Sequence, residues 1–332
     1  MKKLKYLIER IKNLHYDKMI EAAKSAHKKC GKPTFFILVD MVYCGFKYLA
    51  GYSDYYEFKF YKLNAKERAT YVTRGENNKI VSALNDKAYW HIFQEKTEFS
   101  EKFADFIKRE WLDLRKCSLK EFSDFVSVRE KIVAKPVDGI CGQGIRIIKI
   151  NTETDVEKLF AELKAENLNL VDSFVKQHIR LERMYPNSLN TVRIVTILKN
   201  GIATPVFAAL RMGNGKSVDN LCNGGIAATI NIEKGIVDNK GFDAYGNEYE
   251  FHPITKEIIE GFEIPHFDLA LDTVKKAALV VPQIGYVGWD VAISENDVCL
   301  IEANEYPGNN IYYPPAESKI GPLPKFKAAL GK

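Results

Sequence analysis

The sequence of 332 residues lacks the patterns that usually mark metal-binding, disulfide-bonded and membrane-spanning proteins. Its six cysteines are scattered without a C-x-x-C pair, and its six histidines form no H-x-x-x-H motif. We therefore expect no zinc site, and we expect reduced cysteines in a cytoplasmic protein. Apolar runs all fall short of the roughly 20 residues that a transmembrane helix needs.

The sequence also lacks a strong charge imbalance, since its net charge is only +5. Lys and Arg are spread along the chain, which argues against a nucleic-acid partner, although a mildly basic surface would favour anionic ligands. Low-complexity segments and internal repeats are absent as well. With 46% apolar and 27% charged residues, the composition is that of a globular protein, and the length favours about two packed units. The oligomeric state cannot be read from these features.

The N-terminus, MKKLKYLIERIKNLHYDKM, is basic but does not resemble a signal peptide, because charges interrupt each candidate apolar segment. Leu4, Leu7, Ile8, Ile11 and Leu14 follow helical spacing. Such a basic amphipathic helix either packs on the body of the protein or makes a peripheral contact with a membrane surface or a partner.

The rest of the chain alternates between helical and extended patterns. The apolar run TFFILVDMVYC is either a strand or a helix, and the aromatic segment GYSDYYEFKFYKL is expected to be a loop. Helices are expected after a cap at Asn85 or Asp86, in SLKEFSDFVSV, after a capping box of Thr154 and Glu157, and in FDLALDTVKKAALVV. Several short strands between residues 191 and 243 predict an antiparallel sheet, and the Pro-rich tail is expected to be irregular. The pattern is α+β.

Three glycines follow Lys135 in VAKPVDGICGQGIRIIKI. Their order, Gly139-x-x-Gly142-x-Gly144, differs from the G-x-G-x-x-G of a dinucleotide fold, and a strand follows where that fold has a helix. The only G-K-S, at residues 215–217, is not a P-loop, because Leu210 stands where the first glycine is needed. Two strands joined by a glycine-rich turn predict a flap whose N–H groups approach phosphate, or else an ordinary hairpin.

Carboxylates are concentrated in GYVGWDVAISENDVCLIEANEYPG. A turn near residues 294–297 would place Asp290 nearly opposite Glu302, and Glu302 and Asn304 share one face of their strand. Oxygen donors that converge in this way suit Mg²⁺ with a bound phosphate. The alternative is a solvated hairpin with polar residues on its outer face.

Two arginines, Arg193 in NTVRIVTI and Arg211 in AALRMG, occupy strand positions. An arginine that points inward from a strand needs an anionic partner, which could be a transferred phosphate, a substrate carboxylate or a structural Asp or Glu. Asn220 and the pair Gly224-Gly225 mark either a turn or a close backbone approach to a ligand.

Taken together, these segments resemble the ATP-grasp superfamily, and most of all its sugar-transfer-associated branch, which is related to the α-L-glutamate ligases. The matching order is LNDK, VAKPVDGICGQGI, LVDSFVKQH, NTVRIVT, VDN…GG and GWDVAI…LIEAN, from about residue 85 to 310. The resemblance implies two α+β subdomains that sandwich ATP. We expect a mixed region at 1–84, an N-subdomain with the flap at 85–175 and a C-subdomain with the metal site at 176–332.

The resemblance also implies roles for individual residues. Mg²⁺ ligands, of two ions, would be Asp290, Glu302 and Asn304, and basic residues at the transferred phosphate would be Arg193 and Arg211. The nucleotide-binding residues that it implies are Lys87 and Lys135 at the α- and β-phosphates, Gly139, Gly142, Gln143 and Gly144 in the flap, Asp172, Phe174 and Val175 at adenine, Gln177 at ribose, and Asn220. Asp172 is shorter than the usual Glu or Gln, which weakens the expected contact with the adenine amino group.

The implied activity is ATP-dependent ligation of a carboxylate to an amine through an acylphosphate. By analogy with the branch, the carboxylate would belong to a sugar such as a uronic acid, in a nucleotide-sugar or glycan precursor of a surface polysaccharide. A kinase-like phosphotransferase and a non-catalytic nucleotide-binding protein are the alternatives. The sequence offers no general base for the amine.

Overall fold

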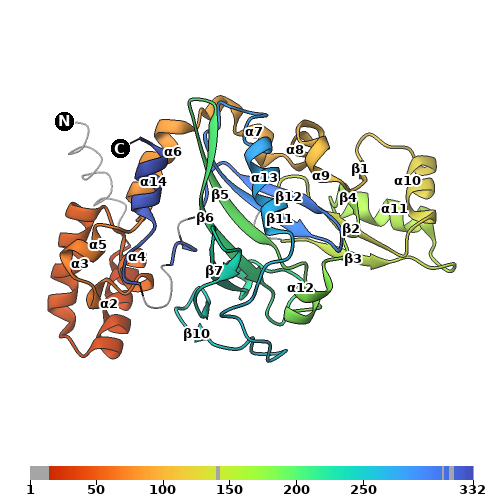
Figure 1. The fold of residues 1–332 in the computed structure, drawn as a ribbon. Helices are drawn as coiled ribbons and strands as arrows, with labels where there is room; N and C mark the ends of the chain where they lie inside the picture. The colour runs from red at the N-terminus through yellow and green to blue at the C-terminus, as the bar shows by residue number, and fades with distance from the viewer. Residues whose placement is uncertain (1–14, 140–142, 309, 314–317, 332) are drawn as a thin grey trace.

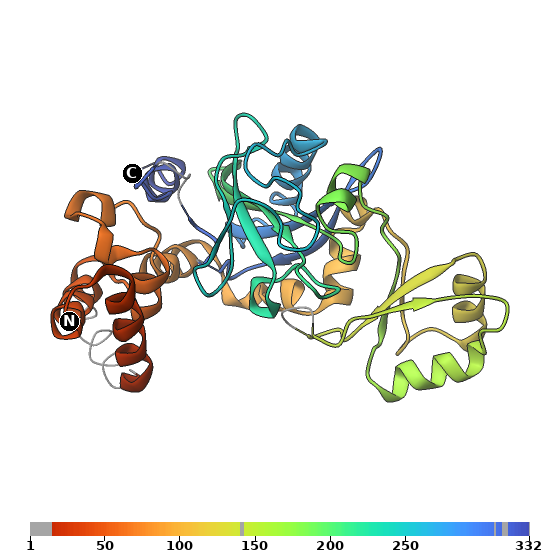
Figure 2. The same ribbon diagram turned by 90° about the horizontal axis from the view of Figure 1, so that it is seen from below.

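The computed structural model describes residues 15–139, 143–308, 310–313 and 318–331, and we consider only these below. Three units follow one another in space: a helical unit at the N-terminus, a central sheet and a smaller sheet (Figures 1 and 2). Within the described residues, no helix is long and apolar enough to cross a membrane.

The N-terminal helical unit is built from short helices around an aromatic core. Its elements are α2 (Tyr16–Cys30), α3 (Thr34–Tyr48), α4 (Tyr52–Glu57), η1 (Phe60–Lys62) and α5 (Ala65–Arg68). The apolar run that could have been a strand is therefore the helix α3, and the aromatic segment expected to be a loop forms α4 and η1. That expectation was wrong because Tyr55, Phe58 and Phe60 are buried in a common core, which overrides weak local propensity.

A group of short helices connects this unit to the sheets. These are α6 (Arg74–Leu84), η2 (Lys87–Tyr89), α7 (His91–Gln94), α8 (Lys96–Lys102) and α9 (Ala104–Ile107). The Asp86 side chain accepts a hydrogen bond from the N–H of Ala88 and so caps η2. The cap predicted at Asn85 or Asp86 is confirmed at Asp86, although a 3₁₀ turn follows first.

The smaller sheet has four antiparallel strands in the order β1-β4-β2-β3. Its elements are β1 (Trp111–Asp113), α10 (Leu119–Ser127), β2 (Lys131–Lys135), β3 (Arg146–Lys149), α11 (Val156–Ala165) and β4 (Leu170–Ser173). α10 and α11 pack on it and share its core. The predicted strand–loop–strand at the glycines is confirmed as β2 paired with β3. The predicted capping box is wrong, since α11 is capped by Asp155, which accepts from the N–H of Lys158.

The central sheet has eight strands and runs β10-β9-β7-β6-β5-β11-β12, with β8 paired to β7. The strands are β5 (Val192–Lys199), β6 (Ile202–Met212), β7 (Ile226–Asn231), β8 (Ile236–Val237), β9 (Gly241–Phe242), β10 (Glu248–Tyr249), β11 (Tyr286–Ile293) and β12 (Val298–Asn304). The helices around it are α12 (Ile179–Met184), η3 (Leu221–Asn223), α13 (Phe267–Ala277) and α14 (Leu323–Ala329). All pairs are antiparallel, as predicted.

Side chains of the central sheet alternate between two cores. One face packs on α13, and the other packs on α6 and α14. Along β5, Ile194 belongs to the first core and Val195 to the second. The tail was expected to be irregular, but Leu323 and Phe326 bury one side of α14 against this second core, which explains why the helix forms.

Candidate functional site

The sheet's two-residue period brings four charged side chains to one place. On β11, Trp289 and Val291 enter the core under α13, so Asp290 points to the opposite face. Arg193 stands beside Asp290 in the register of β5 and β11, and Glu302 stands beside it in the register of β11 and β12. The predicted pairing of Asp290 with Glu302 is thus confirmed, and so is the turn at residues 294–297.

A β-bulge adjusts the last of these strands. The register between β11 and β12 shifts after Asp290, so that Val291 pairs with Leu300 and Ile301 is left over. Leu300 and Ala303 remain in the core, while Glu302 faces the same side as Asp290. Bulges often re-aim a side chain beside a functional site, and this one directs Glu302 toward Asp290.

Both arginines bind Asp290. Arg193 holds its carboxylate through two N–H groups, with 2.9 Å between Nη2 and Oδ2, and Arg211 Nη1 lies 2.8 Å from Oδ2. These guanidinium groups hold the pKa of the buried Asp290 well below its ordinary value. The sequence left a phosphate, a substrate carboxylate and a structural Asp or Glu as possible partners of these arginines. In the structure their partner is the carboxylate of Asp290.

Arg211 is also held from its other side. Its Nη2 lies 2.8 Å from Asp219 Oδ1 and donates to Asn220 Oδ1. Asp219 in turn accepts from the N–H and the hydroxyl of Thr191. A buried guanidinium fixed by two carboxylates is set in position before any ligand arrives. The sequence analysis named Asn220 but not its neighbour Asp219.

Glu302 has a different electrostatic environment from Asp290. Burial, and then the charge of Asp290, raise the pKa of Glu302 to about 7. Two buried carboxylates side by side disfavour a second negative charge, and a divalent cation would relieve that repulsion. Asn304 follows on the same strand, and its buried side-chain nitrogen has no hydrogen-bond partner. The side-chain oxygens of Glu302 and Asn304 fit a magnesium ion, whereas each oxygen of Asp290 is also bound by an arginine.

The set is too small to enclose an ion by itself. Within the described residues, there is no cluster of three or more His, Cys, Asp or Glu side chains that could hold a metal. Mg²⁺ usually keeps water and phosphate oxygens among its ligands.

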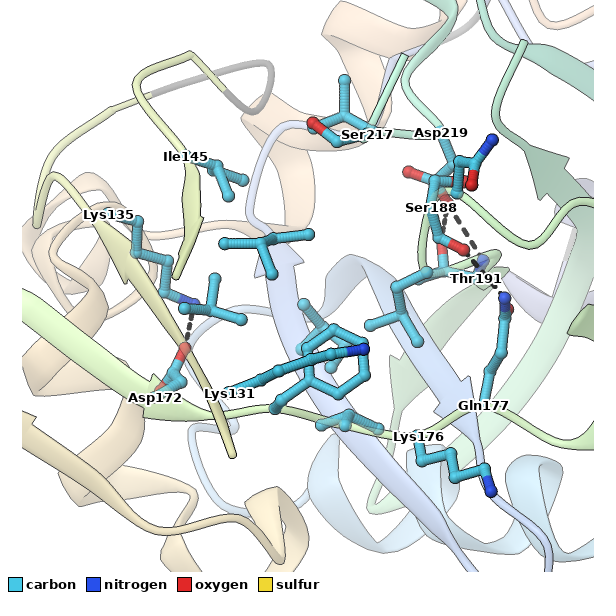
Figure 3. Close-up of a pocket in the computed structure, with 18 of the residues that line it drawn as sticks. Lys131, Lys135, Ile145, Asp172, Lys176, Gln177, Ser188, Thr191, Ser217 and Asp219 are labelled. Atoms are coloured by element: carbon cyan, nitrogen blue, oxygen red, sulfur yellow. Dashed lines mark hydrogen bonds and ion pairs between the residues drawn. The ribbon is translucent and has the colours of Figure 1, made fainter. Parts of the chain in front are cut away.

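A cavity of about 320 Å³ lies between the two sheets, beside these groups (Figure 3). Asp290, Glu302 and Arg211 line one side of it, and Lys131 and Lys135 of β2 line the other. The segment after β4, which includes Phe174 and Val175, also lines the cavity, as expected for a nucleotide hinge. A concave site that is partly apolar and has charges at one end suits a nucleotide.

Lys135 enters this cavity from β2 but is paired within the protein. Its Nζ lies 2.6 Å from Asp172 Oδ2 (Figure 3). Arg109 Nε lies 3.2 Å from Asp172 Oδ1. The two cations lower the pKa of the buried Asp172. The Asp172 carboxylate is thus directed at Lys135 and Arg109, which agrees with the weak adenine contact that we expected for its short side chain.

Arg109 had no signal in the sequence, yet it joins the two sheets. Besides Asp172 on β4, it donates to the carbonyls of Leu300 and Ile301 on β12. These carbonyls belong to the bulge next to Glu302. Only the folded arrangement of β4 and β12 gives this arginine its position.

The lysines expected at the phosphates are placed differently from each other. Lys135 lines the cavity, whereas Lys87 is exposed on η2, outside that lining, with its Nζ 5.7 Å from the ring centre of Trp90. Lys96, which the sequence analysis missed, is half-buried and interacts electrostatically with Glu302 and Lys135. Neither Lys87 nor Lys96 is among the residues that line the cavity, but Lys96 interacts with the charge of Glu302.

Lys96 also holds the base of the glycine segment. Its N–H donates to Val137 O at 2.9 Å, and its Nζ donates to Gly139 O at 2.5 Å. Gly144 has φ +74°, a conformation that favours glycine, and Gln143 beside it is exposed. Gly142 lies outside the described residues.

Gln177 was expected at the ribose, but its amide is engaged by the protein. Its nitrogen donates to the carbonyls of Tyr185 and Ser188, and its oxygen accepts from the backbone and side chain of Asn190. These four bonds fix the loop that leads into β5, so the geometry does not favour the ribose contact. Gly225, by contrast, is needed for close packing, since a Cβ there would lie 2.3 Å from Asp219 O.

Known structures and families were compared with this chain. The PsnB ATP-grasp ligase with its minimal precursor aligns at 14% identity over 80% of this chain and 69% of its own, with a TM-score of 0.41. D-cycloserine synthetase DcsG aligns at 10% identity over 77% and 76%, with 0.43. D-alanine–D-alanine ligase from Bacillus anthracis aligns at 15% identity over 72% and 62%, with 0.37. No curated protein sequence matches the chain.

The family comparison covers most of the chain. Residues 66–318 match the family described as sugar-transfer associated ATP-grasp. This range includes both sheets and every charged residue discussed above. The predicted α+β ATP-grasp fold is confirmed by this match and by the two antiparallel sheets with the cavity between them. The chain belongs to the sugar-transfer associated ATP-grasp family.

Proposed function

We propose that the protein joins a carboxylate to an amine at the expense of ATP, and that the cavity between the sheets is its active site. The observation that carries this proposal is the cluster of Arg211, Asp290 and Glu302 that lines the cavity across from Lys135, with Arg193 bound to Asp290 on the same face of the central sheet. A group of fixed charges of both signs suits a phosphoryl group that changes its bonding partner.

In this proposal the nucleotide lies between the sheets. Phe174 and Val175 contact the base, and Lys135 and Lys96 hold phosphate oxygens under the glycine segment. Asp290, Glu302 and Asn304 would hold Mg²⁺, which would supply positive charge against the phosphates of the nucleotide. Lys96 takes the place that we first assigned to Lys87, because it interacts electrostatically with Lys135 and Glu302.

The reaction has two steps. A carboxylate oxygen of the acid attacks the γ-phosphorus, the bond to the β-phosphate oxygen breaks, and ADP leaves. The nitrogen of the amine then attacks the carbonyl carbon of the acylphosphate, phosphate leaves, and the proton from nitrogen passes to phosphate or water. Arg211, held by Asp219, and Arg193 stabilise the charge that develops on the transferred group and on the acid.

The family description supports a substrate class but does not identify it. We propose that the acid is a carboxylated sugar, such as a uronic acid in a nucleotide-sugar or glycan precursor of a surface polysaccharide, and that an amino acid or another amine is attached to it. The polar and charged lining of the cavity, with Lys131, Lys176 and Ser217, is compatible with such an acid.

The proposal is tested by measuring ADP release with combinations of acids and amines. We expect turnover with MgATP to require one uronic acid and one amine together. The Glu302→Gln variant should lose at least about 100-fold in kcat/KM, since a metal ligand is removed, while Glu257→Gln, at an exposed carboxylate away from the cavity, should match the parent protein. A stable phosphorylated product formed without an amine would instead support a phosphotransferase. Unchanged turnover in Glu302→Gln would refute the metal assignment.

A further inference from the structure

Helix α3 has an apolar face that points away from the protein. Its inward face carries Ile37, Met41, Cys44 and Tyr48, which fill the core of the helical unit. Its outward face, which we call the α3 outer face, consists of Phe35, Phe36, Val39, Val42, Tyr43 and Phe46. Phe35 and Phe36 alone are 70% and 64% exposed. The helix is therefore apolar on the side where a surface helix is normally polar.

Helix α13 does not share this property. The exposed positions of α13 include Asp268, Asp272 and Lys276 around a single Leu269. On α3 the only acidic residue is Asp40, and its carboxylate is bound by both terminal nitrogens of Arg68 at 2.7 Å. A contiguous exposed apolar face of this kind marks a contact surface for a protein or a membrane.

Charge distinguishes between these partners. Residues 1–73 contain 15 Lys and Arg against 7 Asp and Glu, a net charge of +8, whereas the remaining residues contain 33 against 36, a net charge of −3. The modest total of +5 thus conceals a strongly basic N-terminal region. Lys28 lies in the last turn of α2, Lys32 lies two residues before α3 with its Nζ donating to Tyr61 O, and Lys47 lies in the last turn of α3.

An apolar helical face between lysines fits the surface of an anionic lipid bilayer. Aromatic and aliphatic side chains enter the boundary between headgroups and acyl chains, and the lysines bind lipid phosphates. Two copies of a region with charge +8 repel each other, which disfavours a dimer through the same face. Neither argument depends on the proposed ligase reaction.

The position of α3 in the molecule agrees with this contact. α3 lies at one end, in the N-terminal helical unit, while the cavity lies between the central and smaller sheets at the other end (Figures 1 and 2). A protein bound through α3 would keep its cavity accessible to nucleotide and substrates.

We propose that the α3 outer face, with its flanking lysines, docks the protein peripherally on an anionic lipid bilayer. The contact holds the enzyme at the membrane surface through the interfacial insertion of Phe35, Phe36 and Phe46.

The test is co-sedimentation of the full chain with vesicles. We expect binding to vesicles of phosphatidylcholine with 30% phosphatidylglycerol, on the order of tenfold weaker binding to phosphatidylcholine alone, and a decrease as salt screens the lysines. The double variant Phe36→Ser/Phe46→Ser should lose about tenfold or more in vesicle affinity. Its matched control is Phe251→Ser, a 47% exposed phenylalanine outside the helical unit, which should bind like the parent.

A second variant, Lys28→Glu/Lys47→Glu, separates charge from apolar contact, and it should lose the preference for anionic vesicles. Circular dichroism and thermal melting confirm that each variant is folded, which we expect because the substituted side chains are exposed. Unchanged binding in Phe36→Ser/Phe46→Ser, or no binding of the parent to either vesicle, would overturn the proposal. A dimer that Phe36→Ser/Phe46→Ser dissociates, with no vesicle binding by the parent, would also overturn the proposal. Vesicle binding that appears only after residues 1–14 are deleted would do the same, since it would mean that this segment covers α3.

Discussion

Two lysines near the glycine segment allow a direct test of where the phosphates bind. The motif LNDK pointed to Lys87, whereas in the structure Lys96 contacts Gly139 and interacts electrostatically with Lys135 and Glu302, and Lys87 is exposed over Trp90. Replacing each lysine by methionine removes the charge and keeps most of the aliphatic side chain. The two variants therefore compare the same chemical change at two positions 9 residues apart.

The magnitude follows from the contact that Lys96 would make. A hydrogen bond between a charged lysine and a phosphate oxygen contributes about 1.5–3 kcal/mol, and each 1.4 kcal/mol is a factor of ten. Lys96→Met should thus lower kcat/KM for ATP by about 10- to 100-fold. Burial lowers the pKa of Lys96, so the ammonium is less well hydrated than an exposed one and gains more from an anionic ligand.

The assay is ADP release as a function of ATP concentration, together with binding of a non-hydrolysable ATP analogue by calorimetry. Lys87→Met should stay within about threefold of the parent in both, because its ammonium lies at the surface. Thermal melting shows whether Lys96→Met has lost stability through its bond to Gly139. If Lys87→Met lost affinity while Lys96→Met retained it, our assignment of Lys96 would be refuted and the motif would have given the right residue.

Two further predictions concern the same charges. Asp219→Asn should lower kcat by about tenfold with little change in KM for ATP, because it loosens Arg211 without touching the nucleotide. Steady-state kinetics measures both constants, and a change in KM alone would contradict this positioning role. Because burial raises the pKa of Glu302 to about 7 and Mg²⁺ binds the ionised form, Mg²⁺ affinity should fall up to tenfold per pH unit below about 7, with proton release seen by calorimetry in two buffers. Because the raised pKa means that the folded protein favours protonated Glu302, the metal-free protein should lose stability as the pH rises from 4.5 to 7. Mg²⁺ binding and thermal melting that are both independent of pH would show that Glu302 is not a ligand.

The carboxylate hairpin was the part of the site that the sequence predicted best. Strands alternate with a period of two, and the turn at residues 294–297 sets the register, so Asp290 had to stand near Glu302. The bulge at Ile301 could not be read from the sequence, because it depends on how β12 packs under α13. Even so, the pairing was correct at the two residues that carry charge.

Contacts between distant segments were not predictable in the same way. Arg109 is 63 residues from Asp172 in sequence and contacts it only because β1 and β4 pair, and Lys96 reaches Gly139 only when α8 and the glycine segment meet. No local pattern encodes either contact. The sequence also left α3 open between strand and helix, since a continuous apolar run has no period to decide it.

The central claim is that the protein activates a carboxylate by transferring the γ-phosphoryl group to it. It is tested most directly with an acid that supports ADP release and carries ¹⁸O in its carboxylate. Attack of that oxygen on phosphorus predicts one ¹⁸O atom in each phosphate released with the amine present, detected by mass spectrometry. Phosphate that contains only oxygen from ATP and solvent would contradict the acylphosphate route and, with it, the function proposed for this site.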